Sequence, residues 1–245
     1  MHRFYFKEVD KDSEFIEFSK NSSHQIVNVL RMKSGDSIEV FNGKGLSVVA
    51  QIDVEKKNIK AKVISKKNVF EDGLKIDVYQ SIIKNSKLEL IIEKLTELGI
   101  SSFTPLITER SQKKDIISLS ENKINRIRKI CVESAEQSGK FFIPEIRSQE
   151  KFTDVFNNRK LNNPIIFYEN HDESEALNDV NLDLYKNSTL SVFIGPVGGF
   201  SINEINLSRD SGANIVNIGE TILKSDTAAI VSCALLRYLI ENNLS

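Results

Sequence analysis

The pattern of hydrophobic and polar positions divides the chain into two parts. Up to about residue 70, short stretches alternate apolar and polar residues or carry β-branched runs, as β-strands do. These stretches are Arg3–Lys7, Phe15–Phe18, Ser37–Phe41, Leu46–Val54 and Asn58–Ser65. Ser23–Met32 breaks the pattern, because Ile26, Val29 and Leu30 share one helical face. Several strands and one short helix predict a small β-barrel.

A second pattern follows a polar linker predicted at Lys66–Leu74. Strands now alternate with helices, which predicts βα units and a parallel sheet, so we expect an α/β fold. The predicted strands and helices are Ile76–Ile83, Leu88–Leu98, Phe103–Ile107, Glu121–Ser138 and Ile165–Tyr168. The acidic segment Asp172–Asn187 is predicted to be a surface excursion.

Two loops in the last third of the chain carry the candidate chemistry. Phe193–Ser201 reads FIGPVGGFS, an apolar strand that runs into a glycine-rich loop. Ser201 and Glu204 have the spacing of a capping box at the start of the next helix. Ile218–Ala229 repeats the layout, with a loop through Gly219. Ligands of open α/β sheets bind beyond the carboxyl ends of the strands, so we predict that both loops wall one small-molecule pocket.

Composition narrows the class of protein. The 245 residues are 40% hydrophobic and 27% charged, which is ordinary for a globular protein. No apolar run approaches the roughly 18 residues that a membrane span needs, and the start lacks the apolar core of a secretion signal. Cys131 and Cys233 lack metal-ligand spacing and lie in amphipathic segments, so core packing is predicted for both. We therefore expect a cytoplasmic protein without a membrane segment or a metal site.

Charge is distributed unevenly along the chain. Residues 1–140 hold 25 Lys and Arg against 20 Asp and Glu, a net of +5, whereas residues 141–245 hold 8 against 14, a net of −6. A positive front half suits contact with phosphate groups. On charge alone, solvated faces without a partner remain an equal alternative. Motifs for a dinucleotide-binding loop, a P-loop, a nucleophile elbow, a zinc helix and a paired-cysteine site are absent from the sequence.

Several short runs match one family in the same order. They are HRFYF at 2–6, the segment His24–Asp36 with Val29, Leu30 and Arg31, the segment Lys94–Ser111, ESAEQSG at 133–139, GPVGGFSxxE at 195–204 and IGxxILKxDTA at 218–228. This ordered set resembles the SPOUT (α/β-knot) RNA methyltransferases. Within them it is similar to the branch that methylates N3 of a uridine in the RNA of the small ribosomal subunit.

The resemblance implies a fold and partners. It implies a trefoil-knotted parallel sheet at residues 75–245, preceded by a PUA-like β-barrel that binds RNA at residues 1–70. S-adenosyl-L-methionine is the implied cofactor, and 16S rRNA of the small subunit is the implied substrate. A homodimer is implied as well, with the apolar stripe of the last helix, Ala228 to Tyr238, as part of its interface. Core packing alone explains this stripe equally well.

Residue roles follow from the resemblance together with the strand-end rule. Cofactor contacts are expected at the strand ends and in both loops: Glu169, Ile194, Gly195, Gly198, Gly199, Ile218, Gly219, Ile222, Leu223 and Thr227. RNA contacts are expected at cationic residues: Arg3, Arg31, Lys33, Arg110 and Lys113. Uracil N3 is a poor nucleophile until it loses its proton, so catalysis needs a base or an anion-stabilising group. The sequence leaves that residue unknown, with Arg110, Glu133 and Gln137 as candidates.

Four positions depart from the usual motif of the family. Val197 stands where glutamate is usual, Thr221 and Lys224 replace two arginines, and Asp226 replaces a glutamate. We hypothesise that a Glu–Arg pair was lost at positions 197 and 221 together, which leaves no orphan charge. Two alternatives stay open: an α/β-knot methyltransferase with a different RNA target, and an RNA-binding ribosome-assembly factor that has lost catalysis.

Overall fold

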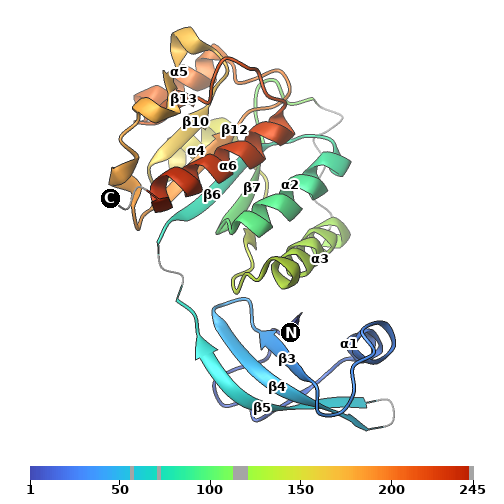
Figure 1. Ribbon diagram of the computed structural model, residues 1–245. Coiled ribbons are helices and arrows are strands. Elements are labelled where there is room, and N and C mark those ends of the chain that lie inside the picture. The colour runs from blue at the N-terminus through green and yellow to red at the C-terminus, as the bar shows by residue number, and fades with distance from the viewer. Residues whose placement is uncertain (56–57, 71–72, 113–120, 243–245) are drawn as a thin grey trace. The chain divides into compact units, whose positions relative to one another are not determined.

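The computed structural model describes residues 1–55, 58–70, 73–112 and 121–242, and it divides into two compact units (Figure 1). The first unit contains residues 1–71 together with 135–143, and the second contains 72–134 and 144–245. Helix α3 (Glu121–Ser138) therefore gives its last residues to the first unit. Each unit has its own sheet.

The first unit is built on a five-stranded sheet. Its strands are β1 (His2–Tyr5), β2 (Phe15–Glu17), β3 (Ser37–Phe41), β4 (Leu46–Glu55) and β5 (Asn58–Asn68). They lie in the order β1-β3-β4-β5-β2, with β1 parallel to β3 and the other pairs antiparallel. The five predicted strands are confirmed within a few residues. Strand β5 continues to Asn68, so the predicted linker is shorter than expected.

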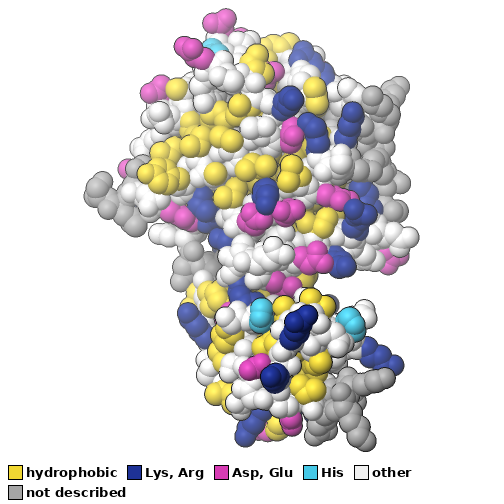
Figure 2. All heavy atoms as spheres, turned by 45° about the vertical axis from the view of Figure 1, so that its right-hand side comes forward, with side chains coloured by type: hydrophobic (Ala, Val, Ile, Leu, Met, Phe, Trp, Pro, Cys, Tyr) yellow, Lys and Arg dark blue, Asp and Glu magenta, His cyan; other side chains and the backbone are white. Residues whose placement is uncertain are grey.

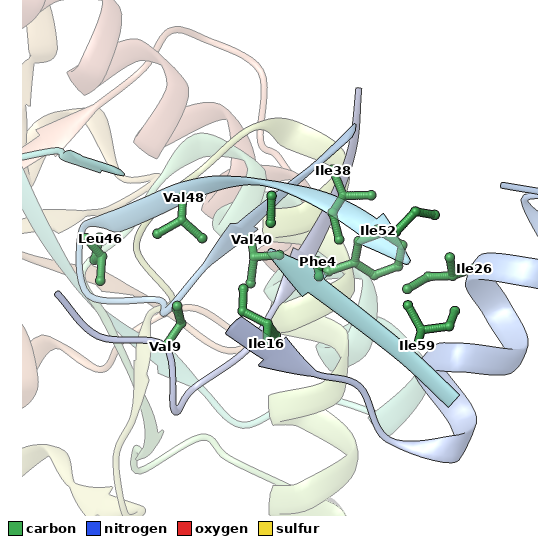
Figure 3. Packing of buried hydrophobic residues seen from close by; sticks show 12 residues of the cluster. Phe4, Val9, Ile16, Ile26, Ile38, Val40, Leu46, Val48, Ile52 and Ile59 are labelled. Atoms are coloured by element: carbon green, nitrogen blue, oxygen red, sulfur yellow. The ribbon is translucent and has the colours of Figure 1, made fainter. Parts of the chain in front are cut away.

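Alternate residues of these strands form the core of the first unit. Figure 3 shows side chains from all five strands and from the helical segment directed toward one another: Phe4, Ile16, Ile26, Ile38, Val40, Leu46, Val48, Ile52 and Ile59. A strand exposes every second side chain, so the alternation seen in the sequence corresponds to one buried and one solvated face.

The helical segment of this unit differs from the prediction. It consists of a short helix, α1 (Lys20–His24), and a turn of π-helix, η1 (Gln25–Val29). The backbone N–H of Leu30 bonds to the carbonyl of Gln25 at 2.9 Å, five residues earlier. Because this turn is wider than an α-helical turn, Val29 is 64% exposed while Ile26 is fully buried. The predicted shared face is therefore wrong at Val29.

Arg3 holds segment 135–143 to the sheet of the first unit. Its Nε lies 2.8 Å from Glu39 Oε2, and its Nη atoms donate to the carbonyls of Ala135 and Lys140 at 3.3 and 3.1 Å. The guanidinium also lies over the rings of Phe41 and Phe141, at 4.9 and 4.6 Å from their centroids. With 11% of its side chain exposed, Arg3 is not available to RNA, and its predicted role as a phosphate contact is corrected.

The second unit is built on a parallel sheet in the order β11-β13-β10-β12-β6-β7-β8, with β9 also paired to β7. Its strands are β6 (Lys75–Ser81), β7 (Ser102–Ile107), β8 (Glu145–Ile146), β9 (Glu150–Lys151), β10 (Pro164–Phe167), β11 (Glu175–Ala176), β12 (Thr189–Ile194) and β13 (Asn214–Asn217). All pairs in it are parallel, so the predicted α/β class is confirmed.

Helices cover both faces of this sheet (Figure 1). Helices α2 (Asn85–Leu98) and α6 (Ser225–Asn242) pack together on one face, and α4 (Phe152–Asn158) and α5 (Ile202–Asp210) cover the other. Aromatic rings fill the second interface: Tyr79 stacks on Phe193 at 4.5 Å, and Phe152 contacts Phe193 and Phe200. The sheet is thus buried on both faces, as its long apolar runs predict.

Segment 172–187 is more than the predicted surface excursion. It forms short 3₁₀ turns and strand β11, and it buries Leu177, Leu182 and Tyr185. The hydroxyl of Tyr185 accepts a hydrogen bond from Asn214 Nδ2 at 2.5 Å. The segment is acidic overall, so its composition does not predict that these three residues are buried.

Both cysteines pack in the core, as predicted. Cys131 and Cys233 are free and fully buried. Burial raises the pKa of Cys131 to about 11 and that of Cys233 to about 12. Neither thiol is therefore suited to act as a nucleophile at neutral pH.

Replacing Arg3 by alanine should destabilise the first unit. The change leaves Glu39 without its ion pair and removes two hydrogen bonds to backbone carbonyls, so we expect the free energy of unfolding to fall by about 3 kcal/mol. Lys7→Ala, at an exposed position of the same unit, should change it by less than about 0.5 kcal/mol. Urea unfolding of both variants measures the difference, and equal values would contradict the anchoring role.

Candidate functional site

A pocket opens at the carboxyl ends of β10 and β13 in the second unit. Its lining comes from these strand ends, the loop after β13 and the start of α6: Phe167, Tyr168, Glu169, Val216, Asn217, Ile218, Gly219, Thr221, Leu223 and Ala228. Most of these side chains are apolar, and Glu169 is the acidic member of the set. A flat, uncharged ring system with a polar appendage fits such a lining.

Asn217 shapes the loop on one side of the pocket. Its Oδ1 accepts from the backbone N–H of Gly219 at 3.3 Å, and its Nδ2 donates to Ser174 Oγ at 3.0 Å. Gly219 has φ of +117°, a conformation that favours glycine. The loop therefore turns away from the strand end and leaves its backbone groups beside the pocket.

Gly199 brings the glycine-rich loop against Glu169. Gly199 has φ of +69°, and a Cβ at this position would lie 2.1 Å from Glu169 Oε1. The absence of a side chain is what allows the Glu169 carboxylate to occupy this position. The loop after β12 and the pocket-lining end of β10 are thus packed together at atomic contact.

Glu204 ties two loops of the site to each other. Glu204 is 2% exposed, and its Oε2 accepts a hydrogen bond from the N–H of Ser201 at 2.9 Å. Its Oε1 accepts from the N–H of Glu109 at 2.9 Å, in the loop after β7. Burial raises the pKa of Glu204, an effect that the hydrogen bonds from Ser201 and Glu109 partly offset. The predicted capping box is confirmed, and the bond to Glu109 adds a tertiary link to it.

Arg110 follows directly in the same loop. Its Nη1 donates to the carbonyl of Gly198 at 2.7 Å, and its Cβ and Cδ would lie 3.7 and 3.6 Å from a Cβ at Gly198. The side chain is exposed. The cationic loop after β7 therefore reaches over the glycine-rich loop and places a permanent positive charge there.

The start of α6 is fixed by polar contacts. Ser225 Oγ donates to the carbonyl of Gly195 at 2.5 Å and accepts from the buried Gln80 Nε2 at 2.9 Å. Asp226 forms an ion pair with Lys87 of α2 at 2.8 Å. The hydrogen bond from Lys87 lowers the pKa of Asp226. Asp226 thus joins α6 to α2, and does not line the pocket.

The structure brings together part of the predicted cofactor set. Glu169, Ile218, Gly219 and Leu223 line the pocket, and Gly199 contacts Glu169. The remaining predicted residues lie outside the lining: Ile194, Gly195, Gly198, Ile222 and Thr227. Ile222 is 75% exposed, and Val197, in the glycine-rich loop, is 78% exposed.

Sequence reasoning missed six lining residues: Phe167, Tyr168, Val216, Asn217, Thr221 and Ala228. Four of them lie at strand ends: Phe167 ends β10, Tyr168 follows it, and Val216 and Asn217 end β13. The strand-end rule that selected Glu169 could also have selected these residues. In the sequence, Thr221 stands out only as a departure from the family motif.

The remaining predicted residues are scattered. Glu133 is exposed and pairs with Lys129 at 3.6 Å on α3, outside the pocket lining. Gln137 is exposed and belongs to the first unit, as do the exposed Arg31 and Lys33. Arg31 has φ of +55°, which is uncommon for a residue with a side chain. Lys113 lies outside the described residues.

Comparison with known proteins identifies the family. Residues 71–237 match the model of an RNA methyltransferase domain, and residues 20–64 match the model of an RNA methyltransferase PUA domain. The chain belongs to this family of RNA methyltransferases. The predicted enzyme class and the PUA-like nature of the first unit are thereby confirmed.

Curated relatives match over nearly the whole chain. Ribosomal RNA small subunit methyltransferase E of Rickettsia conorii is 32% identical over 226 residues, which cover 90% of this chain and 88% of the relative. The protein with the same name from Buchnera aphidicola is 31% identical over 242 residues, covering 97% and 93%.

Solved structures share the fold. A Legionella pneumophila protein described as a methyltransferase, in complex with S-adenosylmethionine, has a TM-score of 0.84 at 29% identity and covers 97% of both chains. Ribosomal RNA small subunit methyltransferase E of Neisseria gonorrhoeae has a TM-score of 0.85 at 24% identity, which shows the fold. Among the residues described here, no helix is long and apolar enough to cross a membrane, and no acidic, histidine or cysteine cluster could hold a metal ion.

Gly199→Ala should show whether the position of the Glu169 carboxylate matters for cofactor binding, apart from the backbone strain that alanine causes at a positive φ. The new Cβ must push aside the Glu169 carboxylate, which is the far end of a flexible side chain, so affinity for S-adenosylmethionine should fall roughly tenfold. Gly212→Ala is the matched control, because Gly212 has φ of +81° with no atom within 4 Å. Both variants should lose about 1–2 kcal/mol of stability, and only the first should lose binding in calorimetry. Equal affinities would contradict a role for Glu169.

Proposed function

We propose that this chain transfers a methyl group from S-adenosylmethionine to N3 of one uridine in 16S rRNA of the small ribosomal subunit. Family membership and the named relatives support the rRNA target, and the ordered sequence motifs support uridine N3. The observation that carries the proposal is the pocket between the ends of β10 and β13, with Glu169 at its edge. We place the reaction in the cytoplasm, in keeping with two buried unpaired cysteines.

The pocket residues suit the adenosine part of the donor. Phe167, Val216, Leu223 and Ala228 offer apolar walls to a purine, and the backbone beside Gly219 offers hydrogen-bonding groups. The Glu169 carboxylate can accept hydrogen bonds from ribose hydroxyls or from an ammonium group. S-adenosylmethionine supplies an electrophilic methyl group on a sulfonium, so the protein has to hold the donor and orient the acceptor.

The acceptor needs help because uracil N3 carries a proton. Arg110 is the candidate that the geometry favours for stabilising the anion, since its guanidinium stands over the glycine-rich loop. Glu133 and Gln137 stay predictions for the catalytic residue that the sequence leaves unknown. Because N3 lies on the pairing edge of the base, the uridine has to be single-stranded or flipped when it reacts.

The two units divide the work in this proposal. We assign residues 1–70 to the PUA-like RNA-binding domain, whose Arg31 and Lys33 are exposed and would contact phosphates. Residues 75–245 form the methyltransferase domain. The strained backbone of Arg31, next to the π-helical turn η1, supports a functional role for this corner, because both features are concentrated at functional sites.

We further propose that the chain acts as a homodimer through α6. Val231, Ala234 and Leu235 of this helix are partly exposed, and Tyr238 is 65% exposed. Figure 2 shows hydrophobic side chains gathered on the face of the second unit that α6 covers in Figure 1. An apolar stripe of this kind on a surface helix supports a protein interface.

Transfer of labelled methyl from S-adenosylmethionine tests the enzymatic proposal. Small-subunit particles and naked 16S rRNA are incubated with the protein, and nucleosides are analysed after digestion. We expect N3-methyluridine, and Arg110→Ala should lower the rate by at least tenfold with cofactor binding unchanged. A different methylated nucleoside would contradict the target. Absence of transfer, with cofactor binding intact, would favour an assembly factor that has lost catalysis.

Sedimentation tests the homodimer. We expect the wild-type chain to sediment as a dimer and Leu235→Glu to sediment as a monomer, because a carboxylate would be buried without a partner. Phe70→Glu, at an exposed apolar residue of the first unit, is the control and should remain dimeric. A monomeric wild-type chain at micromolar concentration would contradict the proposal.

A further inference from the structure

An open groove lies on the outer face of the first unit, between the edge strand β2 and its neighbour β5. Its lining belongs to these strands and to the turn before β2: Ser13, Glu14, Phe15, Lys62, Val63, Ile64, Ser65 and Lys66. It contains none of the residues that the sequence suggests as RNA contacts. Its residues therefore have no role in the function proposed so far.

Two large apolar side chains are displayed in the groove. Phe15 and Ile64 are each 59% exposed. Phe15 alternates with Ile16, which is 2% exposed, so Phe15 is on the outward face of β2. Ile64 is the extra residue of a bulge, because Ser65 pairs with Val49 and Val63 pairs with Ala50. A bulge of this kind re-aims a side chain that regular pairing would have placed elsewhere.

Cations flank the exposed ring. Lys62 lies directly opposite Phe15 in the antiparallel ladder, so both side chains are on the same face. Lys66 lies further along β5 and donates through Nζ to the carbonyl of Lys11 at 2.5 Å. Lys60 is different, because Glu17 pairs with it at 2.9 Å. Glu14 is the carboxylate of the lining and would oppose an anion there.

We propose that this groove binds a single strand of RNA. One base stacks on Phe15, and the adjoining phosphates lie near Lys62 and Lys66. Proteins that hold single strands combine cations along the backbone with aromatic rings under the bases, and every base has a face that can stack. The inference rests on the proposed function for the identity of the RNA, which is the small-subunit rRNA.

Charge favours RNA over a protein partner at this surface. An apolar protein surface that covered Phe15 and Ile64 would also cover Lys62 and Lys66. Glu14 is the carboxylate in the lining that could compensate their charges. Covering ammonium groups with an apolar surface costs free energy, whereas phosphates neutralise these groups as they bind. The ring of Phe15, on the outward face of β2, can stack on an unpaired base. A duplex does not offer such a base, because its bases are stacked on one another.

Binding of a labelled 15-nucleotide uridine strand, followed by fluorescence anisotropy, tests the inference. Phe15→Ala should raise the dissociation constant by about 5- to 150-fold, because one stacked base is lost. Phe70→Ala is the matched control, since Phe70 is 75% exposed in the same unit and lies outside the lining. A duplex of the same length should bind with similar affinity to the wild type and to Phe15→Ala.

The charged residues give a second, independent readout. Lys62→Gln and Lys66→Gln should each reduce the slope of log affinity against log salt by roughly 0.7, and Lys7→Gln should leave it unchanged. Glu14→Gln should tighten binding, because it removes the repelling carboxylate. Undetectable binding of the strand by the wild type, equal effects at Phe15 and Phe70, or unchanged salt slopes would each overturn the inference.

The experiment separates this inference from the enzymatic proposal. Strand binding that depends on Phe15, together with absent methyl transfer to particles, keeps the groove and rejects the enzyme. If the wild type transfers methyl groups normally and Phe15→Ala binds the strand as the wild type does, the enzymatic proposal stands and the groove is rejected. Weaker binding of Phe15→Ala to the particle alone, with strand binding unchanged, would indicate a ribosomal protein as the occupant and reject RNA.

Discussion

The buried carboxylate of Glu204 is the interaction on which the geometry of the site depends. One oxygen accepts from Ser201 at the start of α5, and the other accepts from Glu109 in the loop after β7. A buried acidic group is costly unless hydrogen bonds satisfy it, and here two backbone N–H groups do so. The glycine-rich loop and the cationic loop therefore occupy one arrangement, in which Arg110 reaches the carbonyl of Gly198.

The parallel sheet supplies the frame for that arrangement. Strands β10, β12, β13, β6 and β7 are parallel neighbours, so their carboxyl ends and the loops that follow meet along one edge. Aromatic packing on one face and the α2–α6 pair on the other hold this edge in place. Small residues then decide how closely the loops approach: Gly199 makes room for Glu169, and Gly219 lets the chain turn beside the pocket.

Arg3 belongs to a sequence motif that was matched correctly, but its predicted role as an RNA contact is wrong. It lies in the run that matches the family, and a cation near the start of an RNA-binding unit suggests a phosphate contact. In the structure its guanidinium lies between Phe41 and Phe141 and donates to carbonyls at the end of α3. A guanidinium with this many partners is structural, whereas the predicted RNA contacts Arg31 and Lys33 are exposed.

The sequence alone determined most strands and helices, the parallel α/β class, the capping box and the sheet edge at which the pocket opens. These depend on periodicity over a few residues and on short motifs, which a single chain displays. Only the tertiary structure decided the second bond of Glu204, the burial of Arg3, the pocket lining and the groove beside Phe15. Glu109 and Glu204 are 95 residues apart, and the bulge at Ile64 requires the register of β4 against β5. Contacts between distant segments follow from packing, which local periodicity does not encode.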